Sequence, residues 1–296
     1  MADETAPAFI AEPAEPLQPA RPGGGREVIY RHGVIVRITH WINVLAISLL
    51  LMSGLQIFNA HPRLYWGMYG ADADKPWLEL VAKDPGADKL AGVARVAGRE
   101  FTTTGVLGVS ADQDGAPTAR GFPKWATLPS SQDLATGRRW HFFLAWVFAI
   151  NGLVYLLVGA ANGHFRRDLA PSAREIGPRN VLRSIVDHIR LRHPVGEEAK
   201  RYNILQKLTY LAVVFVLLPA MVVTGLAMSP GFDAVAPWLV SLLGGRASAR
   251  SIHFICADLL VLFVIVHVVE VFLAGVWNEM VSMITGRYAI RTEPRP

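Results

Sequence analysis

The sequence predicts an all-α integral membrane protein whose core is a bundle of four transmembrane helices. Of its 296 residues, 52% are hydrophobic, a larger share than an ordinary soluble domain of this length carries. Four stretches supply the roughly 20 apolar residues that a helix needs to cross a bilayer core about 30 Å thick. Because a chain inside a bilayer must satisfy its own backbone hydrogen bonds, these stretches are expected to be helices.

The expected helices cover about 38–58, 138–161, 205–229 and 250–276, within one membrane domain at 31–290. Residues 1–25, within an expected tail at 1–30, are acidic and then rich in proline, alanine and glycine, without the apolar stretch of a signal peptide. We therefore expect a disordered cytoplasmic tail there, and an uncleaved anchor in the first helix. Residues 291–296 are expected to form a second short tail.

Positive charge predicts the orientation of the bundle, because cytoplasmic loops are enriched in lysine and arginine. The connection 162–207 holds ten basic and five acidic residues, whereas 59–139 holds ten and nine. Arginines also precede the first helix and follow the last. We therefore expect a bacterial cytoplasmic (inner) membrane protein with both termini and residues 162–207 in the cytoplasm. Topology accounts for the net charge of +5, so no nucleic-acid partner is expected.

The connection between the first two helices, 59–137, is unusually long for a helix–helix link. It contains Trp66, Trp77 and Trp125 and many glycines and prolines. It has no CxxC, no HExxH and no phosphate-binding glycine loop, so it does not read as a catalytic domain. We expect an extracytoplasmic insert of short strands and turns that caps the bundle and offers a docking surface.

Nine histidines are present, and four of them sort by depth in the expected bundle. His40 and His267 fall near the cytoplasmic side, while His141 and His253 fall near the outer side. His253 and His267 share the fourth helix, where fourteen residues correspond to about 21 Å and return to nearly the same face. The other five are expected to be solvated or interfacial: His32, His61, His164, His188 and His193.

Each pair by depth joins two different helices, which is the arrangement that holds a metal macrocycle inside a bundle. Two neutral imidazoles can be the axial ligands of a b-type haem iron. The pattern therefore predicts two haem b groups, with His40, His267, His141 and His253 as iron ligands and no side chain assigned to bond chemistry on a substrate.

Other interpretations remain open from the residues alone. Polar groups inside membranes are usually functional, so the same histidines could serve a proton- or metal-coupled transporter. The haems could also be structural elements of a membrane anchor and docking module. A bare zinc or copper site is disfavoured, because such sites generally use three or four convergent ligands.

Three features carry a family resemblance: RITHWINV (37–44), RRWHFFLAW (138–146) and the fourteen-residue spacing of His253 and His267. The chain resembles the bacterial cytochrome b561 / nickel-hydrogenase cytochrome b family over about 31–290. That family includes the gamma subunit of formate dehydrogenase and thiosulfate-reductase-type cytochrome b subunits. The resemblance implies two haem b groups, ligated by His40 with His267 and by His141 with His253. It also implies electron exchange between a respiratory-chain quinone and an extracytoplasmic redox enzyme.

Two segments of the insert refine the expected partner. FNAHPRLYWGMYG (58–70) and RGFPKWATLPS (120–130) resemble the subgroup that accompanies molybdopterin enzymes of the sulfite-oxidase type. This resemblance implies an extracytoplasmic partner of that kind, and makes a hydrogenase or formate dehydrogenase partner less certain.

A polar cluster at the cytoplasmic start of the third helix is a candidate quinone site. Asn203, Gln206 and Lys207 lie on one helical face, near the expected depth of His40 and His267. A quinone carbonyl needs hydrogen-bond donors and a source of protons, which these side chains could supply. The alternative is a solvated helix start with a lysine that extends to the membrane surface.

Overall fold

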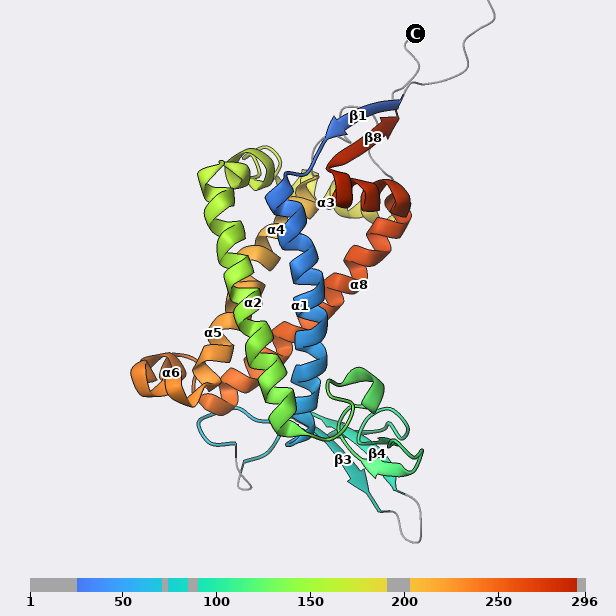
Figure 1. Ribbon diagram of the computed structural model, residues 1–296, viewed down its shortest axis with the longest axis vertical. Helices are drawn as coiled ribbons and strands as arrows, with labels where there is room; N and C mark the ends of the chain where they lie inside the picture. The colour runs from blue at the N-terminus through green and yellow to red at the C-terminus, as the bar shows by residue number, and fades with distance from the viewer. Residues whose placement is uncertain (1–25, 71–73, 85–89, 191–202, 292–296) are drawn as a thin grey trace, which may run out of the picture.

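The computed structural model describes residues 26–70, 74–84, 90–190 and 203–291, and four helical segments in it are long and apolar enough to cross a membrane. The first, second and fourth spans are α1 (Val34–Asn59), α2 (Leu134–Ala161) and α8 (Arg246–Thr285). The third span consists of three consecutive elements: α4 (Ile204–Ala212), the π-helical η4 (Val213–Leu217) and α5 (Leu218–Met228). Figure 1 shows them side by side along the long axis. We call the end of the bundle that carries residues 60–133 the insert end, and the opposite end the terminal end.

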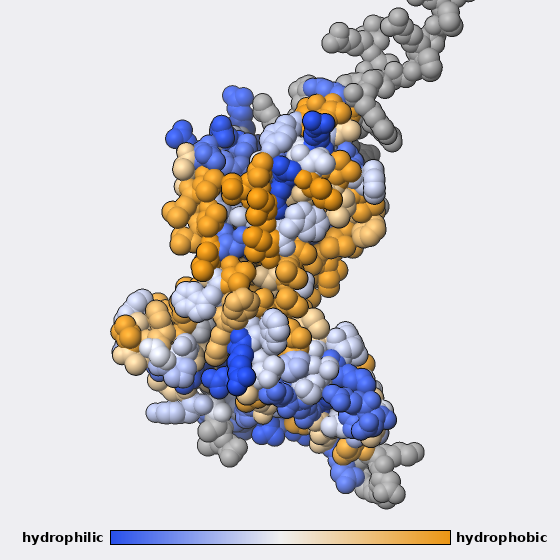
Figure 2. All heavy atoms as spheres, in the orientation of Figure 1, coloured by the Kyte–Doolittle hydropathy of each residue, from blue (hydrophilic) through white to orange (hydrophobic). Residues whose placement is uncertain are grey.

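Apolar side chains on these helices face outward. Phe143, Leu157 and Phe272 are each more than 60% exposed, and Figure 2 shows apolar residues over the middle of the bundle with hydrophilic residues at both ends. Contiguous apolar surface of this extent marks contact with a partner or a membrane. The structure thus agrees with the predicted four-helix membrane bundle.

Polar groups join helices in the interior of the bundle. The Asn151 side-chain amide of α2 donates to the Thr39 carbonyl oxygen at 2.9 Å and to Asn43 Oδ1 at 2.8 Å, both on α1. Asn151 and Thr39 are buried. A buried amide that finds such partners stabilises the pairing of two helices in lipid. In the second half of the bundle, α5 packs along α8.

The insert contains antiparallel sheets, which agrees with the short strands and turns expected there and adds β-structure to the helical bundle. Its four-stranded sheet has the order β2 (Arg63–Leu64), β3 (Leu78–Lys83), β4 (Ala91–Val96) and β5 (Arg99–Thr102), and β6 (Val109–Ala111) pairs with β7 (Pro117–Ala119). A short 3-10 helix, η1, covers Lys124–Ala126. The strands are short, and the hydrophobic pattern of the sequence does not show which of them pair.

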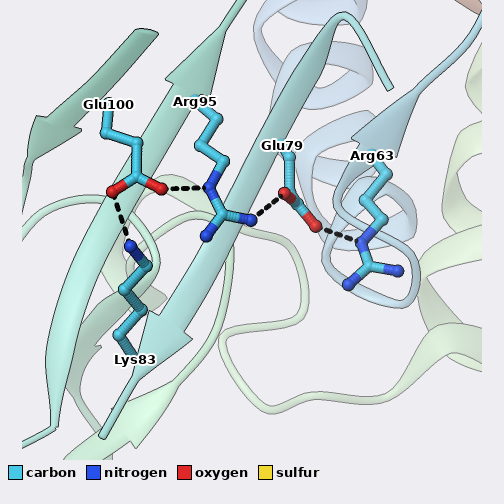
Figure 3. Close-up of polar contacts among 5 residues, drawn as sticks. All are labelled: Arg63, Glu79, Lys83, Arg95 and Glu100. Atoms are coloured by element: carbon cyan, nitrogen blue, oxygen red, sulfur yellow. Dashed lines mark hydrogen bonds and ion pairs between the residues drawn. The ribbon is translucent and has the colours of Figure 1, made fainter. Parts of the chain in front are cut away.

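A line of alternating charges crosses the four-stranded sheet (Figure 3). Arg63 faces Glu79, Glu79 faces Arg95, and Arg95 faces Glu100 in the strand register. Their nitrogen–oxygen distances are 2.6, 2.7 and 2.6 Å, and Lys83 adds a contact to Glu100 at 2.5 Å. Opposite charges that face each other across strands favour this register.

The insert packs directly on the bundle. Phe58, Leu64, Leu80 and Ala94 form a buried cluster against which Phe254 of α8 packs. At the first turn of α8, Ser248 N donates to the Gly67 carbonyl oxygen at 3.1 Å, and Gly67 N donates to Ser248 Oγ at 2.7 Å. The insert loop thereby satisfies a backbone N–H that a helix start leaves without an intrahelical partner.

The next turn of α8 is bound to the insert as well. Ser251 Oγ donates to the Tyr65 carbonyl oxygen at 2.5 Å and accepts from Trp77 Nε1 at 3.0 Å. Arg250 donates to the His61 carbonyl oxygen at 2.6 Å. The insert and the first two turns of α8 thus form one connected polar seam.

At the terminal end a β-strand overlaps each of the two expected tails. Arg26–Tyr30 form strand β1, which pairs antiparallel with β8 (Arg287–Arg291), so that Val28 faces Ala289. This pairing joins segments about 260 residues apart, a distance over which local composition carries no signal. The rest of the predicted disordered tail, 1–25, lies outside the described residues.

The fourth span continues beyond its predicted end. Gly275 has φ +106°, which breaks α8 one residue before that end, and helical structure then resumes to Thr285. The resumed segment returns to the start of α1, where Trp41 Nε1 donates to the Met283 carbonyl oxygen at 3.0 Å and Arg37 donates to that of Ile284. The remaining helical elements are η2 (Phe165–Leu169), α3 (Pro178–Ile189), α6 (Pro230–Val235) and α7 (Pro237–Leu242).

Gly245, which precedes α8, provides a test of the seam. Its φ of +112° and ψ of 170° fall in a region essentially restricted to glycine, and an added Cβ would lie 2.4 Å from the Gly67 carbonyl oxygen. We expect Gly245→Ala to destabilise the protein by about 1–3 kcal/mol, measured as a lower midpoint of thermal unfolding in detergent. Gly231→Ala, in α6 with open space around it, is the matched control. Equal midpoints for the two variants would contradict the importance of this contact.

Candidate functional site

The structure brings the four intramembrane histidines together as two pairs. His141 of α2 faces His253 of α8 with ring centroids 6.3 Å apart and ring planes 67° apart. His40 of α1 faces His267 of α8 with centroids again 6.3 Å apart and planes 65° apart. The first pair lies toward the insert end and the second toward the terminal end. These are the pairs predicted from the expected depth of each histidine in the membrane.

The separation within each pair fits one metal atom between the rings. A metal–imidazole bond is roughly 2 Å long and a ring nitrogen lies about 1.1 Å from the ring centre, so two ligands on opposite sides of one metal place their centroids about 6 Å apart. Both observed distances are 6.3 Å. In the described part of the chain, no group of three or more His, Cys, Asp or Glu residues could hold a metal ion. Each pair therefore offers two imidazole ligands, which would suit a metal held in a macrocycle that supplies the other ligands.

Small residues leave room beside the pair at the insert end. A Cβ on Gly54 would lie 3.3 Å from His141 Cε1, and a Cβ on Gly225 would lie 3.7 Å from His253 Cε1. Hydroxyl groups also contact both rings. Ser53 Oγ lies 3.1 Å from His141 Nδ1, and Thr224 Oγ1 lies 2.8 Å from His253 Nδ1. A hydroxyl thus contacts Nδ1 of each ring, which leaves Nε2 as the atom that can face a metal.

The pair at the terminal end has different surroundings. The Trp41 ring meets His40 edge-on with centroids 5.3 Å apart, and Phe263 stacks on His267 at 5.7 Å with planes 16° apart. His40 Nδ1 is buried and has no hydrogen-bond partner in the part of the chain that the structure describes. An aromatic ring thus packs against each imidazole of this pair.

The three residues of the candidate quinone site lie together at the start of α4, and the structure gives each of them a local role. Asn203 Oδ1 accepts from Gln206 N at 2.8 Å, and Gln206 Oε1 accepts from Asn203 N at 3.2 Å, which makes a reciprocal capping box. Lys207, only 8% exposed, pairs with Glu175 at 2.9 Å. Hydrogen bonding to Lys207 lowers the pKa of Glu175 to about 2, so the Glu175 carboxylate is ionised at neutral pH.

Sequence reasoning missed a second polar site at the terminal end. A cavity of about 260 Å³ lies between the segment that leads into α1 and the last turns of α2; its lining includes His32, Tyr155, Asn162, His164, Arg167 and Asp168. His164 Nδ1 lies 2.6 Å from Asp168 Oδ2. Burial lowers the pKa of His32 to about 4, so this imidazole is neutral at physiological pH. This site could have been found in the sequence, because His32 and His164 flank two spans on the same predicted side of the membrane.

His61, also interpreted as peripheral, lies in the insert and outside both pairs. The His61 ring stacks on Tyr65 in the insert with centroids 5.8 Å apart. His188 belongs to α3, and His193 lies outside the described residues.

A helical membrane bundle with facing imidazole pairs is typical of membrane cytochromes b. Residues 31–286 match the family model described as prokaryotic cytochrome b561, so the chain belongs to this family of membrane haem-binding electron-transfer proteins. The family predicted from the sequence motifs is confirmed. Membership of an electron-transfer family argues against the alternative of a proton- or metal-coupled transporter.

A curated relative covers nearly the same length. The chain is 27% identical over 263 residues, 88% of this chain and 98% of the relative, to a protein of Azospira oryzae named putative protein-methionine-sulfoxide reductase subunit YedZ1. No solved structure matches the chain.

Proposed function

We propose that this protein is a di-haem cytochrome b that relays electrons across the membrane between the quinone pool and an extracytoplasmic redox partner. The observation that carries the proposal is the pair of equal His–His separations, 6.3 Å at each end of the bundle. A haem b bound at each pair would supply one-electron redox chemistry there. His253 and His267 hold the two centres on one helix about 21 Å apart along its axis.

The partner is proposed at the insert end. The insert is rigidly joined to α8 through Ser248 and Ser251, and Trp66, Tyr69 and Trp125 expose more than half of their surface. Exposed aromatic residues are the side chains that protein interfaces favour. We propose a molybdopterin oxidoreductase of the sulfite-oxidase type, which the insert segments resemble. The name of the Azospira relative, a subunit of a reductase, supports a subunit role of this kind.

The quinone is proposed at the terminal end, where Asn203, Gln206 and Lys207 surround the start of α4. The capping box engages the side-chain oxygens of Asn203 and Gln206, so it does not consume their amide N–H donors. Lys207 supplies an N–H donor that is almost fully buried. The cavity beside His32 and His164 is a second place for the head group, because η2, which contributes to its lining, contacts α4.

The membrane is proposed to be the bacterial cytoplasmic membrane, with the terminal end in the cytoplasm. The charge asymmetry between residues 162–207 and the insert supports this orientation. Electrons would then pass between a cytoplasmic-side quinone and an outer partner.

Haem stoichiometry tests the central proposal. The purified protein should contain two haem b groups per chain, measured by pyridine haemochrome assay and by a reduced-minus-oxidised spectrum. His141→Ala or His253→Ala should remove mainly the haem at the insert end, and His40→Ala or His267→Ala mainly the other. His61→Ala, in the insert, is the control and should retain both. A folded wild-type protein with a single haem, or with none, would refute the di-haem proposal.

Thiol labelling tests the orientation. Cys256 is buried and is the one cysteine of the chain, so an introduced thiol reports its own accessibility. Asp114→Cys in the insert and Arg190→Cys beside α3 are both at exposed positions. A membrane-impermeant maleimide added to intact cells should label the first and miss the second. The reverse result would place the insert end in the cytoplasm.

Quinol oxidation tests the head-group site. We expect Lys207→Leu to slow quinol-dependent haem reduction several-fold, because it removes the buried donor, while reduction by dithionite and both haem spectra stay unchanged. Glu175→Gln removes the ion pair but keeps the lysine, and Asn203→Asp keeps the helix cap but removes the amide donor. A quinone role predicts slow reduction in Lys207→Leu and Asn203→Asp and a near wild-type rate in Glu175→Gln.

A purely structural role predicts a different pattern, in which Lys207→Leu and Glu175→Gln behave alike and Asn203→Asp behaves like the wild type. In that case Val158→Trp, which would fill the cavity beside His32, becomes the decisive variant. A slow rate there would move the head group to the cavity.

A further inference from the structure

Two buried hydroxyl groups contact the histidine pair at the insert end. Ser53 lies on α1 and Thr224 on α5, and neither helix supplies a ligand to this pair. Their exposed fractions are 0% and 1%. Ser53 contacts His141 Nδ1 at 3.1 Å and Thr224 contacts His253 Nδ1 at 2.8 Å. All four membrane spans therefore meet at this centre.

The direction of these hydrogen bonds follows from where the hydroxyl protons point. Ser53 Oγ donates to the Leu49 carbonyl oxygen at 2.7 Å, and Thr224 Oγ1 donates to the Ala220 carbonyl oxygen at 2.6 Å, each four residues back in its own helix. A hydroxyl has one proton but two acceptor lone pairs. Since the proton is engaged by the carbonyl, each hydroxyl accepts a hydrogen bond from the imidazole Nδ1–H.

This direction selects one tautomer of each ring. A neutral imidazole carries a single N–H, and if Nδ1 holds the proton then Nε2 holds the lone pair that can bind a metal. Partners of this kind also fix the ring orientation and raise the basicity of the ligand. The two hydroxyls thus prepare Nε2 of His141 and of His253 as iron ligands.

The same short motif occurs on both helices. Ser53 is followed by Gly54 and Leu55, and Thr224 by Gly225 and Leu226. In each case the glycine lies beside the Cε1 atom of the histidine that the hydroxyl contacts. A repeated hydroxyl–glycine–leucine arrangement on two separate helices supports a shared role for both copies.

The pair at the terminal end lacks this arrangement at His40. Its Nδ1 is buried without a hydrogen-bond partner within the described residues, and the neighbouring Thr39 hydroxyl bonds to the Ile35 carbonyl oxygen at 2.8 Å. The two pairs therefore differ in the hydrogen bonding of Nδ1, which has a hydroxyl partner in His141 and His253 but none in His40 within the described residues.

We propose that Ser53 and Thr224 are positioning residues that select the ligating tautomer of His141 and His253 and lower the reduction potential of the centre at the insert end. The inference rests on the proposed haem ligation by this pair. An imidazole whose Nδ1–H donates to an oxygen is a stronger electron donor to iron, which stabilises the oxidised state. Removal of either hydroxyl should therefore raise the potential of that haem alone.

A redox titration of the purified full chain tests this proposal. Thr224→Val keeps the volume of threonine without its hydroxyl, and Ser53→Ala removes the other hydroxyl. In both variants we expect the midpoint of one haem to shift upward while the other midpoint stays at its wild-type value. Thr224→Ser should restore the wild-type midpoint. Ser48→Ala is the matched control, because Ser48 makes the same bond to a carbonyl four residues back and lies on the exposed surface of α1.

The outcomes separate this inference from the proposed function. Two haems in the wild type with unchanged midpoints in Thr224→Val and Ser53→Ala would overturn the inference and leave the proposed function intact. Absence of haem from the wild type would overturn the proposed function itself. If Thr224→Val loses one haem, retention in Thr224→Ser supports the positioning role, whereas loss in both variants shows that packing and not the hydroxyl matters.

Discussion

Placing four imidazole rings inside a bundle that faces hydrocarbon is the constraint on which the rest of this structure depends. A polar ring buried in an apolar environment is unfavourable unless it is bonded. Hydroxyls of Ser53 and Thr224 meet this requirement at one pair, and the 6.3 Å separation of the rings in both pairs leaves room for a shared metal atom. Because α8 contributes one ring to each pair, its axial position sets both centres, and the seam with the insert fixes that position.

Much of the membrane core is predictable from the sequence, because lipid makes the signals strong and local. Long apolar stretches define the spans, and alternating helix direction then sorts His40, His141, His253 and His267 by depth. The fourteen-residue spacing of His253 and His267 places both on nearly the same face of one helix, however that helix packs. The pairs observed in the structure follow from these facts, although their ring angles and hydrogen-bond partners do not.

The remaining features depend on contacts between distant residues. Strand β1 needs β8, some 260 residues later, and the strands of the insert are too short to show a period of two. The polar face of Asn203, Gln206 and Lys207 is equally consistent with a helix start and a quinone site, because an amide side chain carries both an oxygen that can cap a helix and an N–H that can donate to a quinone. In the sequence, Ser53 and Thr224 are small residues of apolar helices with no distinguishing signal. Only the folded chain shows that each lies beside Nδ1 of a histidine.

The seam between the insert and α8 has a mechanical consequence. Ser251, which bonds to the Tyr65 carbonyl oxygen, precedes His253 by two residues in the same rigid turn of helix. A protein bound to the insert is therefore connected to that imidazole through a few stiff bonds rather than through a hinged tether. If the proposed redox partner docks on the insert, the electron-tunnelling distance to the membrane centre would thus be set by the shape of the contact surface, and not by the motion of a flexible loop.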